Sequence, residues 1–375
     1  MIINSVNLEN FRNYESLFIE FDNNTNILYG NNAQGKTNIL ESLYMCSTTK
    51  SHRGSKDKEV IRFGKDEAHI KVIVNKRDVP HRIDIHLRNN KSKGIAIDGI
   101  PIKKASELFG IVNVIFFSPE DLSIIKNGPS ERRKFMDIEL CQIDKMYVNN
   151  LLNYNKIVNQ RNKLLKDLSF NFDKSLYETL DIWDIQLAQY GSLVIKRREE
   201  FIRQINEIIE NIHFKLSGEK ENLVIKYEKN TSEKDLLNQI TLNREKDIKL
   251  KTTNTGPHRD DLGFFINGMD VRKFGSQGQQ RTSALSLKLS EIELVKRVIN
   301  DMPVLLLDDV MSELDSNRQN QLLESIKGVQ TIVTCTGLDE FIENKVSIHK
   351  IYKIVNGTAN LYELDIKNGG NNERE

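Results

Sequence analysis

One octapeptide limits what this chain can fold into more than any other feature: residues 30–37 have the form G-x-x-x-x-G-K-[ST]. A short apolar run precedes it, and a helix is predicted from Gly35 to about Met45, which is the strand–loop–helix context that the motif requires. Its glycines let the backbone turn N–H groups toward phosphate oxygens, and the helix N-terminus adds about half a positive charge. The motif therefore predicts a nucleotide site. The residues expected to contact the nucleotide are Gly30, Asn31, Asn32, Ala33, Gln34, Gly35, Lys36 and Thr37.

An apolar run that ends in two carboxylates supplies the expected second half of this site. Val304–Leu307 suits a strand of a parallel sheet covered on both faces, and ligands bind at the carboxyl ends of such strands. Asp308 and the Thr37 hydroxyl are expected to hold Mg²⁺, and Asp309 to orient or activate the attacking water. Lys36 would reach the β- and γ-phosphates of ATP. By itself, an apolar run that ends in Asp would more often be an ordinary strand end. It is interpreted as part of the site because a phosphate loop needs a metal-binding partner.

A second glycine-containing segment, Phe274–Arg281, precedes a helix predicted at 279–299. A serine and glycines at a helix N-terminus can form a further anion site. A plain capped helix start explains the same residues equally well. Ser312–Asp315, directly after the two carboxylates, also has the form of an ordinary helix start.

The pattern of apolar residues divides the chain into strand-rich ends and a helical middle. Asp98-Gly99 and Asn267-Gly268 are hairpin signals, because both central positions of a type I′ turn need positive φ. From about 130 to 216, apolar residues recur at helical spacing, among them Leu152, Ile182 and Ile185, and Trp183 is expected to pack in the core between helices. The expected strands are 17–21, 26–29, 70–74, 83–87, 95–97, 100–102, 223–227, 262–266, 304–307 and 331–334, with a further helix at 318–326.

We therefore expect an α/β fold with an antiparallel helical arm inserted into it. The arm's two long helices should break at Ser169–Asp173, and the polar segment Asn368–Glu375 should fray. The expected domains are an N-terminal part of the nucleotide-binding lobe at 1–125, the helical arm at 126–220, and a C-terminal part of the same lobe at 221–375.

Composition excludes several classes of protein. Charged residues make up 29% and hydrophobic residues 38%, as in an ordinary globular protein, and apolar runs are too short for a membrane span. The N-terminus does not resemble a signal peptide. Cys46, Cys141 and Cys335 show no metal-ligand spacing, so structural thiols in a reducing, cytoplasmic setting are expected. A net charge of +1 means that any nucleic-acid contact must come from local patches.

Taken in order, these motifs resemble those of the ABC ATPases. Ser276–Gln280 is similar to the ABC signature and Ser312–Asp315 to the D-loop. The resemblance implies that Ser276, Gly278 and Gln279 complete the nucleotide site of a second protomer. A transporter subunit fits less well. The helical arm and the residues of the signature depart from that class, as do Thr336 at the switch position and the Q-loop position near 117–122.

Six strings spread over nearly the whole chain resemble the RecF family of SMC-like ABC ATPases. They are Asn10–Tyr14, similar to the family's opening strand, Phe117–Leu122, Gly128–Asp137, Gly256–Leu262, Ser276–Thr282 and Leu305–Asp315. The resemblance implies an ABC-ATPase head without a long coiled coil, an ATP-dependent homodimer, and weak, DNA-stimulated ATP hydrolysis. It further implies recombinase loading at single-stranded or gapped DNA, a role in SOS induction, and RecR and RecO as partners.

Three short basic runs are candidates for DNA contact. Lys50–Lys58 contains Lys50, Arg53 and Lys56, and the other two runs are 132–134 and 196–198. Such runs are usually solvated faces, although lysine, arginine and serine together suit phosphate contacts. His258 and Arg259 invite a catalytic interpretation, but a turn with structural ion pairs to Asp260 or Asp261 is favoured.

Two other functions would use the same phosphate loop. The motor subunit of a membrane transporter would have a membrane partner and no dependence on DNA. A small-molecule kinase would leave the signature and D-loop strings without a role.

Overall fold

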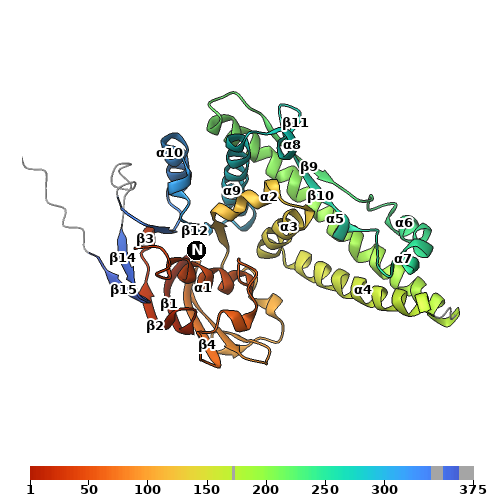
Figure 1. The fold of residues 1–375 in the computed structure, drawn as a ribbon, viewed down its shortest axis with the longest axis horizontal. Helices are drawn as coiled ribbons and strands as arrows, with labels where there is room; N and C mark the ends of the chain where they lie inside the picture. Colours follow the sequence, from red (N-terminus) through yellow and green to blue (C-terminus); the bar gives the residue numbers. More distant parts are fainter. Residues whose placement is uncertain (171–173, 339–348, 363–375) are drawn as a thin grey trace, which may run out of the picture.

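The computed structural model describes residues 1–170, 174–338 and 349–362. Two sheets with a helix between them form one end of the molecule, and a long helical arm extends from the other (Figure 1). Among the described residues, no helix is both long enough and apolar enough to cross a bilayer.

The sheet that carries the phosphate loop is mixed. Its strands are β3 (Thr25–Tyr29), β8 (Val114–Phe117), β12 (Val304–Asp308), β13 (Thr331–Cys335), β14 (Lys350–Val355) and β15 (Thr358–Leu361). Their order is β15-β14-β3-β13-β12-β8, and all neighbours are parallel except β14 and β15. β8 and the apolar part of β12 are buried on both faces, which is why their sequences are continuously apolar.

The second six-stranded sheet is antiparallel and is built almost wholly from neighbouring segments. Its strands are β1 (Ile2–Phe11), β2 (Tyr14–Glu20), β4 (Glu67–Lys76), β5 (Val79–Arg88), β6 (Gly94–Ile97) and β7 (Ile100–Pro101), in the order β2-β1-β4-β5-β6-β7. Alternate residues are buried against α1 (Lys36–Thr48), whose other side packs on the mixed sheet. The opposite face of this antiparallel sheet points outward.

The arm and the elements that pack on it share a separate core. A three-stranded sheet in the order β11-β10-β9 lies along the arm and contacts its longest helix (Figure 1). These elements are α3 (Pro129–Ile143), α4 (Lys145–Phe170), α5 (Lys174–Leu216), α6 (Leu236–Leu242), α7 (Arg244–Leu250), β9 (Leu223–Glu228), β10 (Asp261–Ile266) and β11 (Met269–Asp270).

Two helices contribute to both cores. α9 (Gln277–Ile299) contributes Leu285 and Leu289 to the core on the mixed sheet, and Ala284 and Leu287 to the core of the arm. The end of α5 likewise places Leu216 in the core on the mixed sheet. The remaining helices are α2 (Leu122–Lys126), α8 (Val271–Phe274), α10 (Ser316–Ser325) and the 3₁₀ turns η1 (Asp57–Glu59), η2 (Ala105–Leu108), η3 (Pro119–Asp121), η4 (Pro257–Arg259) and η5 (Met311–Glu313).

Most predicted elements are present. Both hairpin turns have the expected backbone, with φ of 54° and 81° at Asp98 and Gly99 and 48° and 85° at Asn267 and Gly268. β14, β15, α6 and α7 were not predicted. α4 continues through Ser169 and Phe170, so the predicted break does not begin there, and its remaining residues 171–173 lie outside the described residues, as does 368–375.

The helical spacing predicted for the arm is confirmed, since Leu152 lies in α4 and Ile182 and Ile185 lie in α5. All three side chains are more than half exposed, because they lie on the solvent side of the arm. The string Asn10–Tyr14 contains the last two residues of the opening strand β1, the turn with Arg12 in the left-handed region at φ 54°, and the first residue of β2. Trp183, by contrast, is half-buried against the arm's core, as predicted.

Candidate functional site

The phosphate-loop segment joins the end of β3 to α1, and its backbone needs residues that tolerate positive φ. Gly30, Ala33 and Gly35 have φ of 151°, 63° and 110°. A Cβ on Gly30 would collide with the Ile354 carbonyl oxygen, and one on Gly35 would lie 2.7 Å from the Tyr14 hydroxyl oxygen. Only glycine satisfies both the conformation and the space at these two positions.

Lys36 is the first residue of α1 and its side chain folds back over the loop. Its ammonium group donates to the carbonyl oxygens of Gly30 at 2.5 Å and Asn31 at 3.0 Å. Burial lowers the pKa of Lys36, and the nearby carboxylates of Asp309 and Asp308 oppose that shift. The loop thus holds a charged donor at its centre, where a phosphate group would compete with two neutral carbonyls for it.

Thr37 and Asp308, which are far apart in sequence, meet at the carboxyl ends of β3, β13 and β12. The Thr37 hydroxyl donates to Asp308 Oδ1 at 2.8 Å, and the Thr334 hydroxyl donates to the same oxygen at 2.8 Å. A hydroxyl and a carboxylate oxygen at this spacing are the hard ligands that Mg²⁺ prefers. The arrangement fits a magnesium site next to the loop.

Asp309 directly follows β12 in a left-handed conformation, with φ of 53°. Its backbone N–H donates to the Thr334 hydroxyl at 3.0 Å, so Thr334 holds both carboxylate residues in place. Thr336, which sequence comparison assigned to the switch position, is exposed beyond the end of β13. On β13 it is therefore Thr334 that binds the Asp308 carboxylate and the Asp309 backbone N–H.

Two residues that sequence reasoning missed support the loop from outside. The Asn13 side-chain amide, in the β1–β2 turn, donates to the Gln34 carbonyl at 2.9 Å, and the Asn356 backbone N–H donates to Gln34 Oε1 at 2.6 Å. Asn13 also accepts from the Asn38 side chain at 2.8 Å. Its place inside a family-like string was the only available signal.

The segment 50–58 emerges beside α1. Lys50, Arg53 and Lys56 are exposed, so all three charges are available on the surface. Arg12 anchors the segment, since it pairs with the fully buried Glu41 at 2.6 Å and donates to the Ser55 hydroxyl at 2.8 Å.

The other two basic runs are not surface patches. Arg132 is 1% exposed and forms a two-pronged ion pair with Asp261, and Arg198 is 2% exposed and binds Asp137 at 2.8 Å. Arg197 pairs with Asp144 at 2.7 Å. The carboxylates that pair with these arginines are distant in sequence, so the runs by themselves resembled solvent-exposed charges.

The signature-like segment forms the N-terminus of α9. The Ser276 hydroxyl accepts from the Gln279 N–H at 3.2 Å, and Gln279 Oε1 accepts from the Ser276 N–H at 2.9 Å. The interpretation of this segment as a capped helix start is therefore correct. A Cβ on Gly278 would lie in ordinary contact with the Ser276 hydroxyl at 3.8 Å and with Arg318 Nη2 at 3.9 Å. Among the described residues, no hydrogen bond or ion pair joins Ser276, Gly278 or Gln279 to residues 30–37. One chain therefore presents the two halves of the expected site separately.

A side chain of α10 links the D-loop-like segment to this helix. Asp315 caps α10 by accepting from the Arg318 N–H at 3.0 Å, and Arg318 also donates to the Thr282 hydroxyl of α9 at 2.6 Å. The segment after Asp309 is thus tied mechanically to the segment that carries Ser276.

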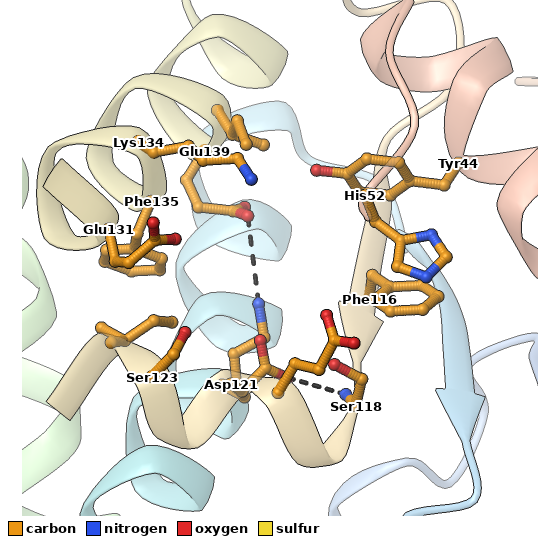
Figure 2. Close-up of a pocket in the computed structure, with 14 residues that line it drawn as sticks. Tyr44, His52, Phe116, Ser118, Asp121, Ser123, Glu131, Lys134, Phe135 and Glu139 are labelled. Atoms are coloured by element: carbon orange, nitrogen blue, oxygen red, sulfur yellow. Dashed lines mark hydrogen bonds and ion pairs between the residues drawn. The ribbon is translucent and has the colours of Figure 1, made fainter. Parts of the chain in front are cut away.

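A cavity of 110 Å³ lies where the arm meets the sheets, beside the 117–122 string (Figure 2). Asp121, Glu139 and Lys288 line this cavity, and Glu291 lies behind it against Lys288; we call these four residues the seam cluster. Glu139, Lys288 and Glu291 are buried, and Asp121 is half-buried. Lys288 donates to Glu291 at 2.6 Å and lies 4.0 Å from Glu139, while Asp121 accepts from the Ser118 N–H at 2.8 Å. Burial raises the pKa of Glu139 to about 7 and also raises the pKa of Glu291 and Asp121.

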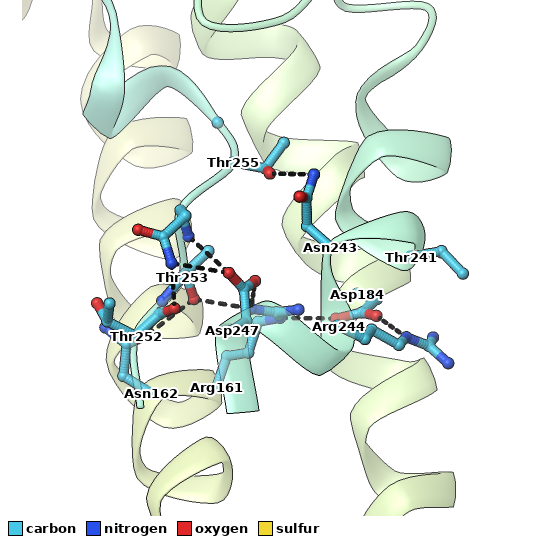
Figure 3. Close-up of polar contacts among 12 residues, drawn as sticks. Arg161, Asn162, Asp184, Thr241, Asn243, Arg244, Asp247, Thr252, Thr253 and Thr255 are labelled. Carbon is cyan, nitrogen blue, oxygen red and sulfur yellow. Dashed lines mark hydrogen bonds and ion pairs between the residues drawn. The ribbon is translucent and has the colours of Figure 1, made fainter. Parts of the chain in front are cut away.

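A second group of buried charges holds the arm together (Figure 3). We call it the arm cluster; it consists of Arg161, Asp184, Arg244 and Asp247. Arg161 donates to Asp184 and Asp247 at 2.7 Å each, and Arg244 donates to Asp184 at 2.6 Å. These contacts join α4, α5 and α7.

His258 and Arg259 are structural, but the expected ion pairs are absent among the described residues. His258 is hydrogen-bonded to the Tyr154 hydroxyl at 2.6 Å and to the Thr253 carbonyl at 2.9 Å. Because the carbonyl can only accept, Nε2 carries the proton and Nδ1 accepts from Tyr154. Arg259 donates to the Thr253 carbonyl, whereas Asp260 and Asp261 pair with Arg198 and Arg132.

Comparison with known proteins agrees with this architecture. Residues 2–360 match the family model described as RecF/RecN/SMC N terminal domain. The "DNA replication and repair protein RecF" of Lachnoclostridium phytofermentans is 63% identical over 96% of this chain and 99% of its own length. The protein of the same name from Lachnospira eligens is 64% identical over 95% of this chain and 98% of its own length.

Solved structures extend the likeness to three dimensions. A structure of the recombination mediator protein RecF with ATP superposes with a TM-score of 0.89 at 36% identity, covering 96% of this chain and 98% of the other. A Pyrococcus furiosus Smc head domain shares the fold alone, with a TM-score of 0.56 at 16% identity over 96% of both chains. The predicted fold class, an ABC-ATPase head with an added helical arm, is confirmed. The chain belongs to the RecF family of DNA replication and repair proteins.

Proposed function

We propose that the chain is an ATP-dependent DNA-binding protein of recombinational repair, in which two copies close over ATP and Mg²⁺. The observation that carries the proposal is the division of the site. Thr37 and Asp308 meet beside the phosphate loop, whereas Ser276 and Gly278 lie at the N-terminus of α9, with no hydrogen bond to that loop among the described residues. A second copy is the natural source of the missing half.

The residues of the loop suit the steps that ATP hydrolysis requires. Bound Mg²⁺ would neutralise charge on the β- and γ-phosphates. Thr37 and Asp308 would hold that ion, and Lys36 would exchange its two carbonyl partners for phosphate oxygens. Asp309 would orient the attacking water. Its side chain is shorter than the glutamate of many ABC proteins, so we propose slow turnover that DNA stimulates.

The relatives support the choice of ligand and pathway. A 36% identical neighbour was solved with ATP, and its description places that protein in the RecFOR pathway. We therefore propose RecR and RecO as partners, single-stranded and gapped DNA as the substrate, and recombinase loading and SOS induction as the outcome. We also propose that 1–125 and 221–375 together supply the ATPase lobe and that 126–220 supplies the arm. The packing of β9 on α5, and of β10 on β9 and α3, attaches part of the last segment to the arm.

The mass of the protein in solution, measured by light scattering, tests the composite site. We expect the mass to double with Mg-ATP in the wild type, to stay monomeric in Lys36→Met, and to double in the surface control Lys65→Met. Asp309→Asn should form an ATP-bound dimer that does not hydrolyse ATP. A wild type that stays monomeric with ATP and DNA together would contradict the proposal.

DNA binding is assigned to Lys50, Arg53 and Lys56, because all three are exposed beside α1. Reversing these three charges to glutamate should weaken DNA binding and flatten its dependence on salt, since fewer counterions are released. A matched triple reversal of the exposed Lys91, Lys103 and Lys104 should have little effect. Equal losses in both triple variants would show that only net charge matters.

A further inference from the structure

A row of chemically related side chains crosses the outer face of the antiparallel sheet. Glu9 of β1 lies opposite His69 of β4, which lies opposite His86 of β5, which in turn lies opposite Gly94 of β6. Glu67 is two residues before His69 and so projects from the same face. Their neighbours along the strands, such as Ile70 and Ile85, are buried on the inner face, so the row is held in register by the core.

These side chains are close enough to share one ion. His86 Nε2 lies 2.9 Å from Glu67 Oε2, His69 Nε2 lies 3.9 Å from Glu67 Oε1, and the two imidazole rings stack with centroids 4.0 Å apart. One ligand atom from each of the three residues lies within 4.8 Å of the other two. Donors around a tetrahedral zinc ion, at bonds of about 2.1 Å, are separated by about 3.4 Å. Both histidines are partly exposed, so small side-chain rotations suffice to bring their nitrogens together.

We infer that Glu67, His69 and His86 form a surface site for Zn²⁺ or a similar divalent transition metal, with water at the fourth position. Two imidazoles with one carboxylate favour zinc over Mg²⁺ or Ca²⁺, which prefer oxygen ligands throughout. The ion would replace the proton that His86 and Glu67 share in their hydrogen bond.

The surroundings of the row leave room for the ion and its water. The row lines an open hollow of 360 Å³, and Gly94 contributes no side chain beside His86. Glu9 adds a further carboxylate at the rim. A surface histidine–carboxylate pair is common without a metal, and His81 with Asp98 is one on this same sheet, 2.9 Å apart. What distinguishes the row is the second imidazole directly opposite the first.

The experiment uses the full chain, stripped of metal with a chelator, without nucleotide. Zn²⁺ binding is followed by calorimetry, and Co²⁺ is used as a probe because its visible spectrum reports tetrahedral coordination. We expect one Zn²⁺ per chain, an increase in thermal stability on binding, and no displacement by excess Mg²⁺. His69→Gln and His86→Gln should each weaken binding by at least about tenfold. His81→Gln is the matched control and should bind as the wild type does.

The proposal would be overturned by a wild type that does not bind Zn²⁺. Undiminished binding in the His69→Gln/His86→Gln double variant would also overturn it, because the metal would then sit on other groups, such as thiols. Far-UV circular dichroism of each variant verifies that the fold is intact. Since the measurement needs no ATP or DNA, its outcome is independent of the proposed ATPase function.

Discussion

The seam cluster and the arm cluster both bury charge, but they do so in opposite ways. In the arm cluster, two arginines face two aspartates, and Arg161, Asp184 and Asp247 are fully buried. In the seam cluster, one lysine faces three carboxylates beside a cavity, and Glu139 Oε2 and Glu291 Oε1 have no hydrogen-bond partner among the described residues. Arg161 Nη2 of the arm cluster also has no hydrogen-bond partner among the described residues, so the two clusters differ in charge balance and not in the completeness of their hydrogen bonds. The arm cluster has opposite charges in equal number, whereas the excess carboxylates of the seam cluster are relieved by taking up protons.

Removing Arg161 should have the largest effect. Arg161→Met leaves Asp184 and Asp247 buried with less compensation, and breaking a buried pair in this way costs about 3–5 kcal/mol. Urea unfolding at neutral pH measures the loss. Arg203→Met, which removes a largely exposed arginine from pairs with Glu200 and Glu207, should change stability very little, because solvent screens surface pairs. Similar losses in both variants would remove the distinction between buried and surface pairs.

Removing Lys288 should have a smaller effect, because the neighbouring carboxylates can bind protons. Lys288→Met should destabilise the chain by about 2 kcal/mol at pH 8 and by less at pH 5.5. Adding Glu291→Gln should recover much of the loss at pH 8, since it removes one of the uncompensated charges. A loss that is independent of pH and is not recovered would show that Lys288 acts by packing alone.

The seam cluster should also make the wild type more stable in mild acid. The pKa of Glu139 is about 7 in the folded chain, above the 4.5 of an unperturbed glutamate, so the folded state binds more protons between these values. Stability from this group is complete below pH 4.5 and is lost as the pH rises through 7, which amounts to about 2 kcal/mol between pH 5.5 and 7.5. Glu139→Gln should remove that slope in urea titrations across this range. An unchanged slope would exclude Glu139 as its source.

The base of the arm should show the opposite dependence. Burial lowers the pKa of His258 to about 4, below its usual 6.5, so the unfolded state binds the extra proton. Stability is complete above pH 6.5 and falls as the pH drops toward 4, by about 1 kcal/mol between pH 7.5 and 5.5. In His258→Gln this contribution should disappear. If both variants shifted the pH profile in the same direction, the two regions would not differ as the charges indicate.

Sequence reasoning succeeded where the determining residues are adjacent. The phosphate loop, both hairpin turns and the apolar strand before Asp308 are local patterns, and the meeting of Thr37 with Asp308 follows from the geometry of parallel strands. It failed where the partner is distant. Arg132 looks solvated until Asp261, 129 residues later, folds against it. The seam cluster was not predicted for the same reason, since no local pattern relates Glu139 to Lys288.

The place of β3 in its sheet has a consequence for how the chain is made. The antiparallel sheet is complete once residue 101 has been synthesised, but β3 pairs with β13 and β14, which follow it by roughly 300 residues. At about 5–20 residues per second, β3 waits on the order of 15–60 s for either neighbour. During that interval its apolar residues Ile27 and Leu28 lack their final neighbours, so chaperones can bind them or they can pair with a wrong strand. A chain cut short near residue 300 would keep the whole phosphate-loop motif and still lack β12 and β13, the two strands that bring Asp308 and Thr334 to it.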